Sequence, residues 1–139
     1  MASPLLNGHG KFCMIEALFN QPEMLAAQKT LDAVALRQEA LASNVANAET
    51  PGYKRIDLST NFQSDLARAC ASGDSQQISD LQPALAPDAT ATTTSPDGNN
   101  VNLENEMLQM NQNTLLHTLE TQIVSYQLSK MRMAVTGKS

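Results

Sequence analysis

The sequence contains no tryptophan, and aromatic residues make up only 4% of it. Large aromatic side chains supply much of the burial energy of a compact core, so their scarcity argues against a densely packed globular domain. No apolar run approaches the roughly 20 residues that a membrane-spanning helix needs. The beginning of the chain also lacks the apolar core and cleavage site of a signal peptide, since Glu16 interrupts it. Composition alone therefore predicts one small cytosolic domain of 139 residues.

Acidic residues outnumber basic residues in the sequence. The chain has 9 lysines and arginines against 14 acidic residues, a net charge of −5 and a pI near 4.8. Nucleic-acid binding needs a basic face to neutralise phosphates, so this balance argues against a nucleic-acid partner. Charged residues of both signs make up only 17% of the chain, and a surface of amides and hydroxyls is suited to packing against other copies.

Residues that carry chemistry are sparse and scattered. Cys13 and Cys70 match no metal-ligand spacing and form no disulfide framework. His117 has no second histidine or cysteine at helical spacing, which argues against a metal site. Glu104 and Glu106 fall on different faces of a helix and are predicted to act as helix N-terminal charges. We expect no catalytic residues, no metal, no cofactor and no small-molecule substrate.

The first half of the chain predicts a tail followed by a long helix. Residues 1–13 hold a proline and two glycines without periodicity, which indicates a flexible tail. Residues 14–49 are predicted to be helical, with Pro22 at a permitted first-turn position. Apolar residues then recur three and four positions apart, with one polar member: Met24, Ala27, Leu31, Val34, Gln38, Leu41, Val45 and Ala48. This seam fits either a helix of an ordinary bundle or one strand of a coiled coil.

A tight turn follows the helix. Pro51 cannot continue a helix, and the residue before it is pushed out of the helical region. Thr50-Pro51-Gly52-Tyr53 fits a type II turn, in which glycine takes a positive φ at the third position. Asn44 and Asn47 lie in the last helical turns, where their amides can satisfy unpaired carbonyls or where asparagine can tolerate a left-handed cap.

The middle of the chain is divided into two segments. Residues 50–70 are predicted to contain the turn, a brief extended stretch and a short amphipathic helix, whose Phe62 and Leu66 pack back on the long helices. Residues 71–100 are rich in small polar residues and are predicted to be an irregular linker or a short β segment.

Residues 101–139 are predicted to form a second long helix. Asn102 is a favourable N-cap, and lysines and arginines near the C-terminal end suit the helix dipole. Its apolar stripe, which includes Leu119, Ile123 and Tyr126, is too broad for contact with a single partner helix. Such a helix is either buried in a bundle or packed between copies in an assembly.

The stretch from Ser43 to Arg55 resembles the signature of bacterial flagellar axial proteins, which form the rod, the hook and the hook-associated parts. The shared pattern is Asn-x-Ala-Asn-x-x-Thr-Pro-Gly-Tyr, and it is carried here by Asn44, Ala46, Asn47, Thr50, Pro51, Gly52 and Tyr53. The resemblance implies an all-α dominated fold, in which two long terminal helices pair as an antiparallel coiled-coil hairpin around a small irregular or β-containing middle. Leu31, Val34, Leu41 and Val45 would pack in this hairpin with Leu119, Ile123 and Tyr126.

The segment from Asp97 to Met107 narrows the resemblance to the small proximal rod subunits of the basal body, and the ending from Leu128 to Lys138 is also similar. Asn102, His117 and Met131 depart from the residues usual there, which affects packing detail only. The resemblance implies a structural, non-enzymatic subunit of the periplasm-spanning rod that contributes to motility. It would be exported without cleavage through the flagellar type III apparatus, which overrides the cytosolic prediction.

The partners implied are other rod proteins, copies of the same chain, and components of the export gate and membrane ring. The sequence around Met14 also resembles the start of rod proteins, so Met14 is a candidate start of translation and Met1 is the alternative. Two alternatives stay open at this point: another small flagellar axial protein, and a cytosolic helical export adaptor or chaperone.

Overall fold

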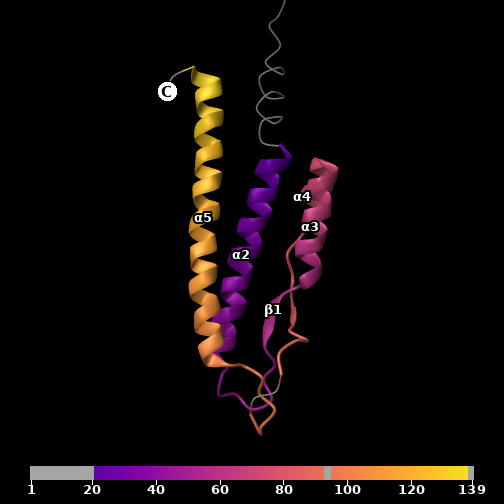
Figure 1. Ribbon diagram of the computed structural model, residues 1–139, viewed down its shortest axis with the longest axis vertical. Coiled ribbons are helices and arrows are strands. Elements are labelled where there is room, and N and C mark those ends of the chain that lie inside the picture. Colours follow the sequence, from indigo (N-terminus) through magenta and orange to yellow (C-terminus); the bar gives the residue numbers. More distant parts are fainter. Residues whose placement is uncertain (1–20, 93–94, 138–139) are drawn as a thin grey trace, which may run out of the picture.

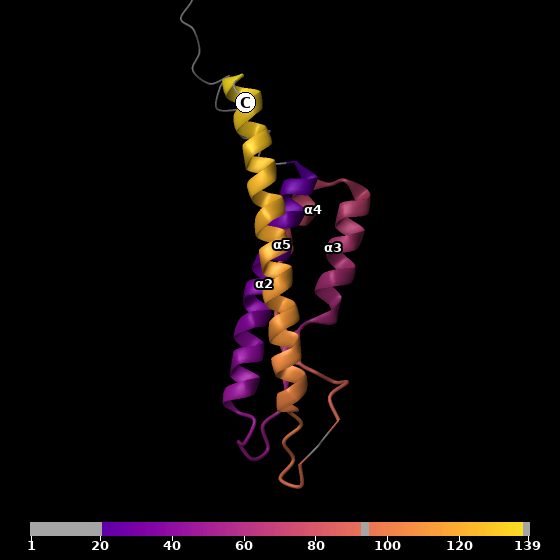
Figure 2. The same cartoon turned by 60° about the vertical axis from the view of Figure 1, so that its left-hand side comes forward.

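The computed structural model describes residues 21–92 and 95–137, and within them the protein is dominated by helices. Two helices, α2 (Pro22–Ala46) and α5 (Leu103–Thr136), run side by side along most of the molecule (Figures 1 and 2). Two shorter helices, α3 (Thr60–Ser72) and α4 (Ser75–Asp80), lie on the side of α2 away from α5 (Figure 1). The predicted tail at residues 1–13 and the proposed start at Met14 lie outside the described residues.

Helix α2 begins and ends where local chemistry requires. Pro22 occupies the first helical position, where its missing N–H costs nothing. The helix ends at Ala46, before the turn. Tyr53 N donates to Thr50 O at 3.2 Å and Gly52 has φ +73°, which confirms the predicted type II turn.

A two-stranded antiparallel sheet pairs the segment before α3 with the segment after α4. Strand β1 (Ile56–Leu58) pairs with β2 (Leu85–Pro87), with Asp57 opposite Ala86. The brief extended stretch was expected, but α4 was not. Its N-cap, Asp74, accepts hydrogen bonds from Gln76 N and Gln77 N, a local signal within the linker predicted to be irregular.

Helix α5 starts after Asn102, whose side chain accepts from Asn105 N and confirms the predicted N-cap. It is joined to α2 by side-chain hydrogen bonds at three levels, one of which is Arg37 Nη2 to Gln109 Oε1 at 3.0 Å. Asn44 Nδ2 donates to Glu106 Oε2 at 3.0 Å, and Asn113 Nδ2 donates to Val34 O at 2.9 Å. Residue numbers therefore rise along α5 as they fall along α2.

The core between these helices is narrow and contains much alanine. Of the residues predicted to pack, Val34 and Leu41 are buried, while Leu31 and Val45 are half-buried. Ala33 and Ala40 are also buried. Among the described residues, no helix is long and apolar enough to cross a membrane.

The three α5 residues predicted to pack keep about half or more of their surface exposed. Leu119, Ile123 and Tyr126 are 47%, 45% and 65% exposed. The reason is the one-sided contact: α2 lies against one side of α5, while the apolar residues of α5 extend around it. Their role in helix packing therefore stays a prediction, with the exposed part of each side chain free for a surface outside this chain.

Candidate assembly site

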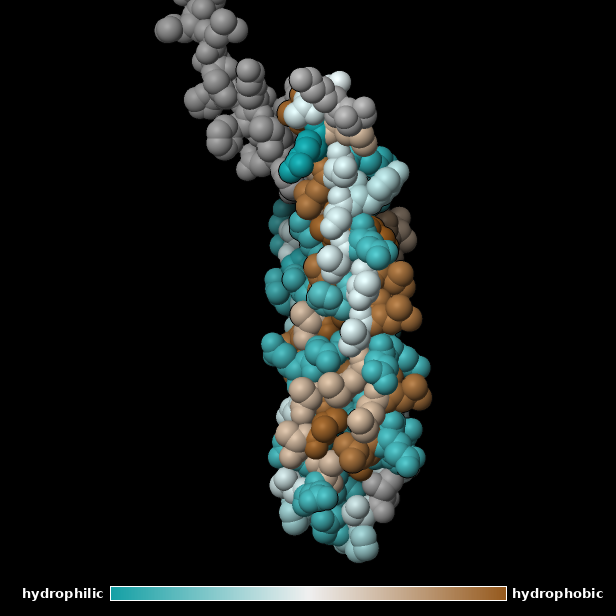
Figure 3. All heavy atoms as spheres, turned by 90° about the vertical axis from the view of Figure 1, so that its left-hand side faces the viewer, coloured by the Kyte–Doolittle hydropathy of each residue, from teal (hydrophilic) through white to brown (hydrophobic). Residues whose placement is uncertain are grey.

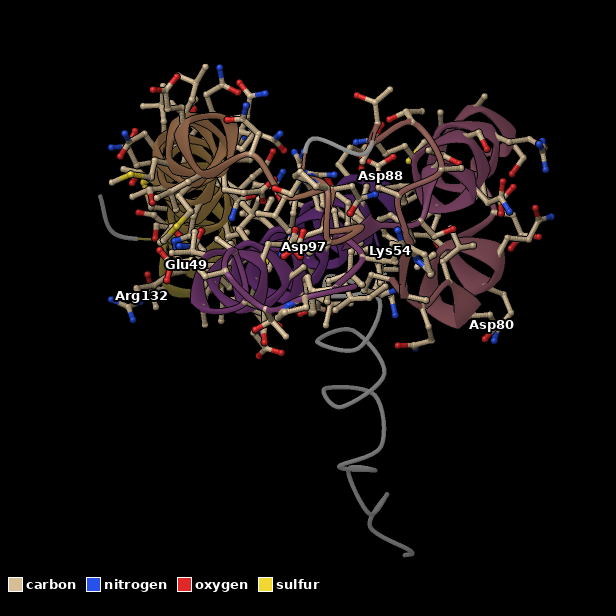
Figure 4. The ribbon with its side chains drawn as sticks, turned by 90° about the horizontal axis from the view of Figure 1, so that it is seen from below. Glu49, Lys54, Asp80, Asp88, Asp97 and Arg132 are labelled. Atoms are coloured by element: carbon tan, nitrogen blue, oxygen red, sulfur yellow. The ribbon has the colours of Figure 1, made fainter. Side chains whose placement is uncertain are left out.

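The turn after α2 and the segment before α5 bind each other at one end of the molecule. Gly52 N donates to Asp97 O at 3.1 Å, and Lys54 Nζ donates to Gly98 O at 2.6 Å. Figure 4 looks onto this end, where Lys54 and Asp97 lie on neighbouring loops. Two of the stretches that resemble flagellar proteins in sequence thus form one structural unit, called here the motif junction: residues 44–57 together with residues 97–106.

Asn99 closes the C-terminal end of α2. Its Nδ2 lies 2.9–3.0 Å from the carbonyl oxygens of Asn47, Ala48 and Thr50. The last carbonyls of a helix have no partners within the helix, and Asn99 satisfies carbonyls just beyond that end while it is itself only 1% exposed. A side chain about fifty positions along the chain therefore supplies the cap.

Asn44 is fully buried and connects α2, β1 and α5. Its Nδ2 donates to Ile56 O and Glu106 Oε2, while its Oδ1 accepts from Ile56 N and from Tyr53 OH. Because both ends of the amide are used, this position requires asparagine: aspartate lacks the donor and leucine lacks both groups. The prediction that Asn44 satisfies a helix-end carbonyl was wrong, since its partners lie on other elements.

The remaining motif residues divide into two groups. Asn47 Nδ2 donates to Ser43 O as expected, Thr50 Oγ1 donates to Asn47 Oδ1, and Tyr53 OH lies 3.1 Å from Ser43 Oγ. The second group, Ala46, Pro51 and Gly52, exposes its side chains or backbone to solvent. Ala46 and Pro51 are available to partners, whereas Gly52 also holds the junction together with the first group, because its N donates to Asp97 O.

Arg55 lies at the centre of the junction and is 6% exposed. Its guanidinium donates to Glu106 Oε1 at 2.6 Å, to Asp57 Oδ2 at 2.8 Å and to Asp88 Oδ2. A buried charge persists only when it is paired and hydrogen-bonded, and here one cation has three carboxylate partners. Arg37 adds a second cation, with Nε 2.9 Å from Asp57 Oδ1.

These contacts shift the pKa values of the charged groups. Burial alone would lower the pKa of Arg55, but hydrogen bonds and charge from Glu106 and Asp57 raise it above its ordinary value. Burial alone would raise the pKa of Asp57, yet hydrogen bonds from Arg37 and Arg55 hold it below its ordinary value of 3.8. The hydrogen bond from Thr90, and then the charge of Arg55, lower the pKa of Asp88. All three groups are therefore ionised at neutral pH.

Sequence reasoning missed this charged cluster. Glu106 lies in the first turn of α5, as predicted for a helix N-terminal charge; what was missed is that its side chain is 1% exposed and bound to Arg55 and Asn44. Arg55 was noted only as a cation after the turn. One signal was present: Glu106 follows the N-cap by four residues, the spacing that turns a side chain back towards the preceding elements.

The large exposed apolar residues of the described chain all lie on α5. Five of them follow one another at spacings of seven or four residues and are 41–65% exposed; together they are called the α5 stripe: Leu108, Leu115, Leu119, Tyr126 and Met133. Figure 3 faces α5 and shows apolar residues along it, separated by polar ones. Large exposed apolar side chains gathered on one helix mark a candidate interaction site, and this spacing suits a helical partner.

The described residues contain no group of three histidine, cysteine or acidic side chains placed to hold a metal ion. Arg55 and its carboxylates neutralise one another inside the fold. What the arrangement offers is a rigid junction at one end and an apolar helix face along the side, both of which suit binding to other proteins.

Comparison with known proteins gives consistent matches. A family described as "Flagella basal body rod protein" matches residues 24–54. The flagellar basal body rod protein FlgB of Salmonella typhimurium is 31% identical over 126 residues, covering 79% of this chain and 90% of that protein. FlgB of Escherichia coli is 32% identical over 75% of this chain and 86% of its own length, and FlgB of Borrelia hermsii is 27% identical over 78% and 92%.

Proposed function

Because this chain belongs to the FlgB family of flagellar basal body rod proteins, we propose that it is built into the proximal part of the rod through its α2–α5 pair. It is a structural subunit of the bacterial flagellar basal body rod. In the assembled rod, α2 and α5 form an antiparallel coiled-coil hairpin, and the α5 stripe packs against other rod proteins and copies of the same chain.

The exposure of the α5 stripe is the observation that carries this proposal. A long helix that keeps large apolar side chains 41–65% exposed gains stability only when a partner covers them. The hydrogen bonds at Asn44 and Asn113 support the hairpin, since they hold α5 in one register against α2. The motif junction then fixes the angle at which the middle of the chain leaves the hairpin.

Export and further contacts belong to the same proposal. The chain reaches the rod uncleaved through the flagellar export gate, and it contacts the gate or membrane ring during assembly. A cytosolic export adaptor would have a similar charge and helix content, but that alternative leaves the turn at Gly52 without a role.

The test is incorporation into basal bodies. Leu115→Glu places a charge in the stripe, where Leu115 is 62% exposed; Thr118→Glu places the same charge on an exposed position of α5 outside it. We expect Leu115→Glu to be absent from purified basal bodies and to abolish swimming. The Thr118→Glu variant should be incorporated normally, and circular dichroism should show equal helix content in both.

Mass spectrometry of the same basal bodies gives the intact mass, and hence whether the mature chain begins at Met1 or Met14 and whether it is cleaved. Wild-type protein that is missing from basal bodies and abundant in the cytosol would contradict the rod assignment and favour the adaptor.

A further inference from the structure

The α5 stripe is symmetric about position 117. Leu115 and Leu119 lie two residues on either side of that position, and Leu108 and Tyr126 lie nine residues on either side of it. Two copies of α5 that run antiparallel about a two-fold axis at position 117 therefore place Leu115 opposite Leu119 of the second copy. The same axis places Leu108 opposite Tyr126, so the apolar side chains of the two helices meet one another.

Polar residues on the same side of α5 follow the same symmetry. Gln112 and Gln122 lie five residues on either side of position 117, and both are exposed. Together with the stripe they form an unbroken series of four- and three-residue steps from Leu108 to Tyr126, which is the spacing of a coiled coil. Antiparallel pairing places Gln112 opposite Gln122 of the second copy. Each of these amides has both a donor and an acceptor, so the two can satisfy each other where the contact excludes water.

The charges of α5 favour the antiparallel direction. Glu106 is buried and Glu120 is half-buried. The other acidic residues, lysines and arginines of this helix are exposed, with Glu104 near its start and Lys130 and Arg132 near its end. Parallel pairing would bring like charges together at both ends. Antiparallel pairing brings Glu104 to Lys130 of the second copy, because each lies 13 residues from position 117, and it also opposes the two helix dipoles.

Helix α2 leaves this side of α5 accessible. The α5 residues Glu106 and Asn113 bind α2, and each comes two residues before a member of the stripe, Leu108 and Leu115. Two residues correspond to a rotation of about 200° around a helix, so the stripe and the α2 contact lie on nearly opposite sides of α5. Figure 1 agrees, since α5 forms one edge of the molecule and α2, α3 and α4 all lie to the same side of it.

We propose that two copies of this chain associate through an antiparallel α5–α5 contact with two-fold symmetry, centred on position 117. The contact itself does not depend on the rod, but its role rests on the proposed function. A two-fold contact closes on itself and gives a dimer instead of an array. The dimer therefore covers the α5 stripe in the unassembled chain, and it separates when rod neighbours take the place of the second copy.

Disulfide trapping tests the direction of this contact. In a background of Cys13→Ser and Cys70→Ser, one protein carries Leu108→Cys and the other carries Tyr126→Cys. Mixed and oxidised with diamide, the two should give a cross-linked heterodimer on a non-reducing gel. Either protein alone should give at least tenfold less, because the two copies of position 108 would lie 18 residues apart, about 27 Å along the helix. Leu128→Cys, exposed on another side of α5, replaces Tyr126→Cys as the matched control and should also give at least tenfold less.

A charge exchange tests the ends of the contact. The Glu104→Lys chain carries positive charge at both ends of α5, and the Lys130→Glu, Arg132→Glu chain carries negative charge at both ends. Each chain alone should self-associate about fivefold more weakly than wild type in sedimentation experiments, as expected when two surface ion pairs become repulsive. An equimolar mixture should associate within about twofold of wild type. Both variants keep their altered helix ends in the mixture, so its recovery measures the contact alone.

Three results would overturn the proposal. Cross-linking of each single-cysteine protein with itself, at the yield of the mixture, would show parallel pairing. A mixture that cross-links no better than the Leu128→Cys control would assign the stripe to another rod protein or to residues 1–20. Unchanged association of the Glu104→Lys chain would show that these charges do not face each other. In each case normal incorporation of the wild-type chain into basal bodies would leave the rod function standing.

Discussion

Replacing Arg55 with methionine tests whether the charged cluster holds the motif junction together. The substitution keeps an apolar stem of similar length and removes the cation that Glu106, Asp57 and Asp88 share. Asp57 would retain Arg37, and Asp88 would retain the hydrogen bond from Thr90.

Of the three carboxylates, Glu106 loses the most compensation for its charge in the Arg55→Met variant. It is 1% exposed and would keep a single donor, Asn44 Nδ2 at 3.0 Å. Removing one member of a buried ion pair costs about 3–5 kcal/mol. Because one hydrogen bond remains, we expect Arg55→Met to lower the free energy of unfolding by about 3 kcal/mol, a large share of the roughly 5–15 kcal/mol of a typical domain.

The assay is urea unfolding followed by circular dichroism, with the slope of the transition checked for two-state behaviour. Arg68→Met is the matched control, since Arg68 pairs with Asp65 at the surface with 77% of its side chain exposed, and it should change stability by less than about 0.5 kcal/mol. Adding Glu106→Gln to Arg55→Met removes the uncompensated charge and should restore about 1–2 kcal/mol. An Arg55→Met loss no greater than that of Arg68→Met, or no recovery in the double variant, would refute the reasoning.

Three further predictions concern the junction. Asn99→Ala removes the donor to three carbonyls, so it should lower the free energy of unfolding by about 2 kcal/mol and speed amide hydrogen exchange at the end of α2. The control Asn111→Ala, on the exposed surface, should leave amide exchange there unchanged. In Gly52→Val the new side chain meets open space, but the backbone must keep φ +73°. The variant should therefore lower the free energy of unfolding by about 1–2 kcal/mol and reduce swimming in soft agar. Normal swimming would contradict the role given to the turn. Because the folded-state pKa of Asp57 lies below 3.8, its ionised form stabilises the fold above about pH 4, and this contribution is lost as the pH falls towards the folded-state pKa. Asp57→Asn should therefore flatten the loss of stability between about pH 5 and pH 3, and an unchanged profile would show that other carboxylates dominate.

The sequence by itself determined the features whose causes are local. Pro22 at the first turn of α2, the Asn102 N-cap of α5 and the type II turn at Gly52 each depend on residues within a few positions of one another. The family followed from the same kind of evidence, because the pattern from Asn44 to Tyr53 is continuous. Burial of Val34 and Leu41 was predictable for a related reason, since helical periodicity places them on one face.

Tertiary structure decided which distant groups meet. Asn44 and Glu106 are 62 positions apart, and Asn113 and Val34 are 79 apart; no local rule places an amide beside a carboxylate across such loops. The same is true of α5, whose periodicity identified an apolar stripe but could not say that α2 would cover only one side of it. Exposure of Leu119 and Tyr126 is a property of the packed chain, because it depends on where the single partner helix lies and not on the sequence of the helix itself.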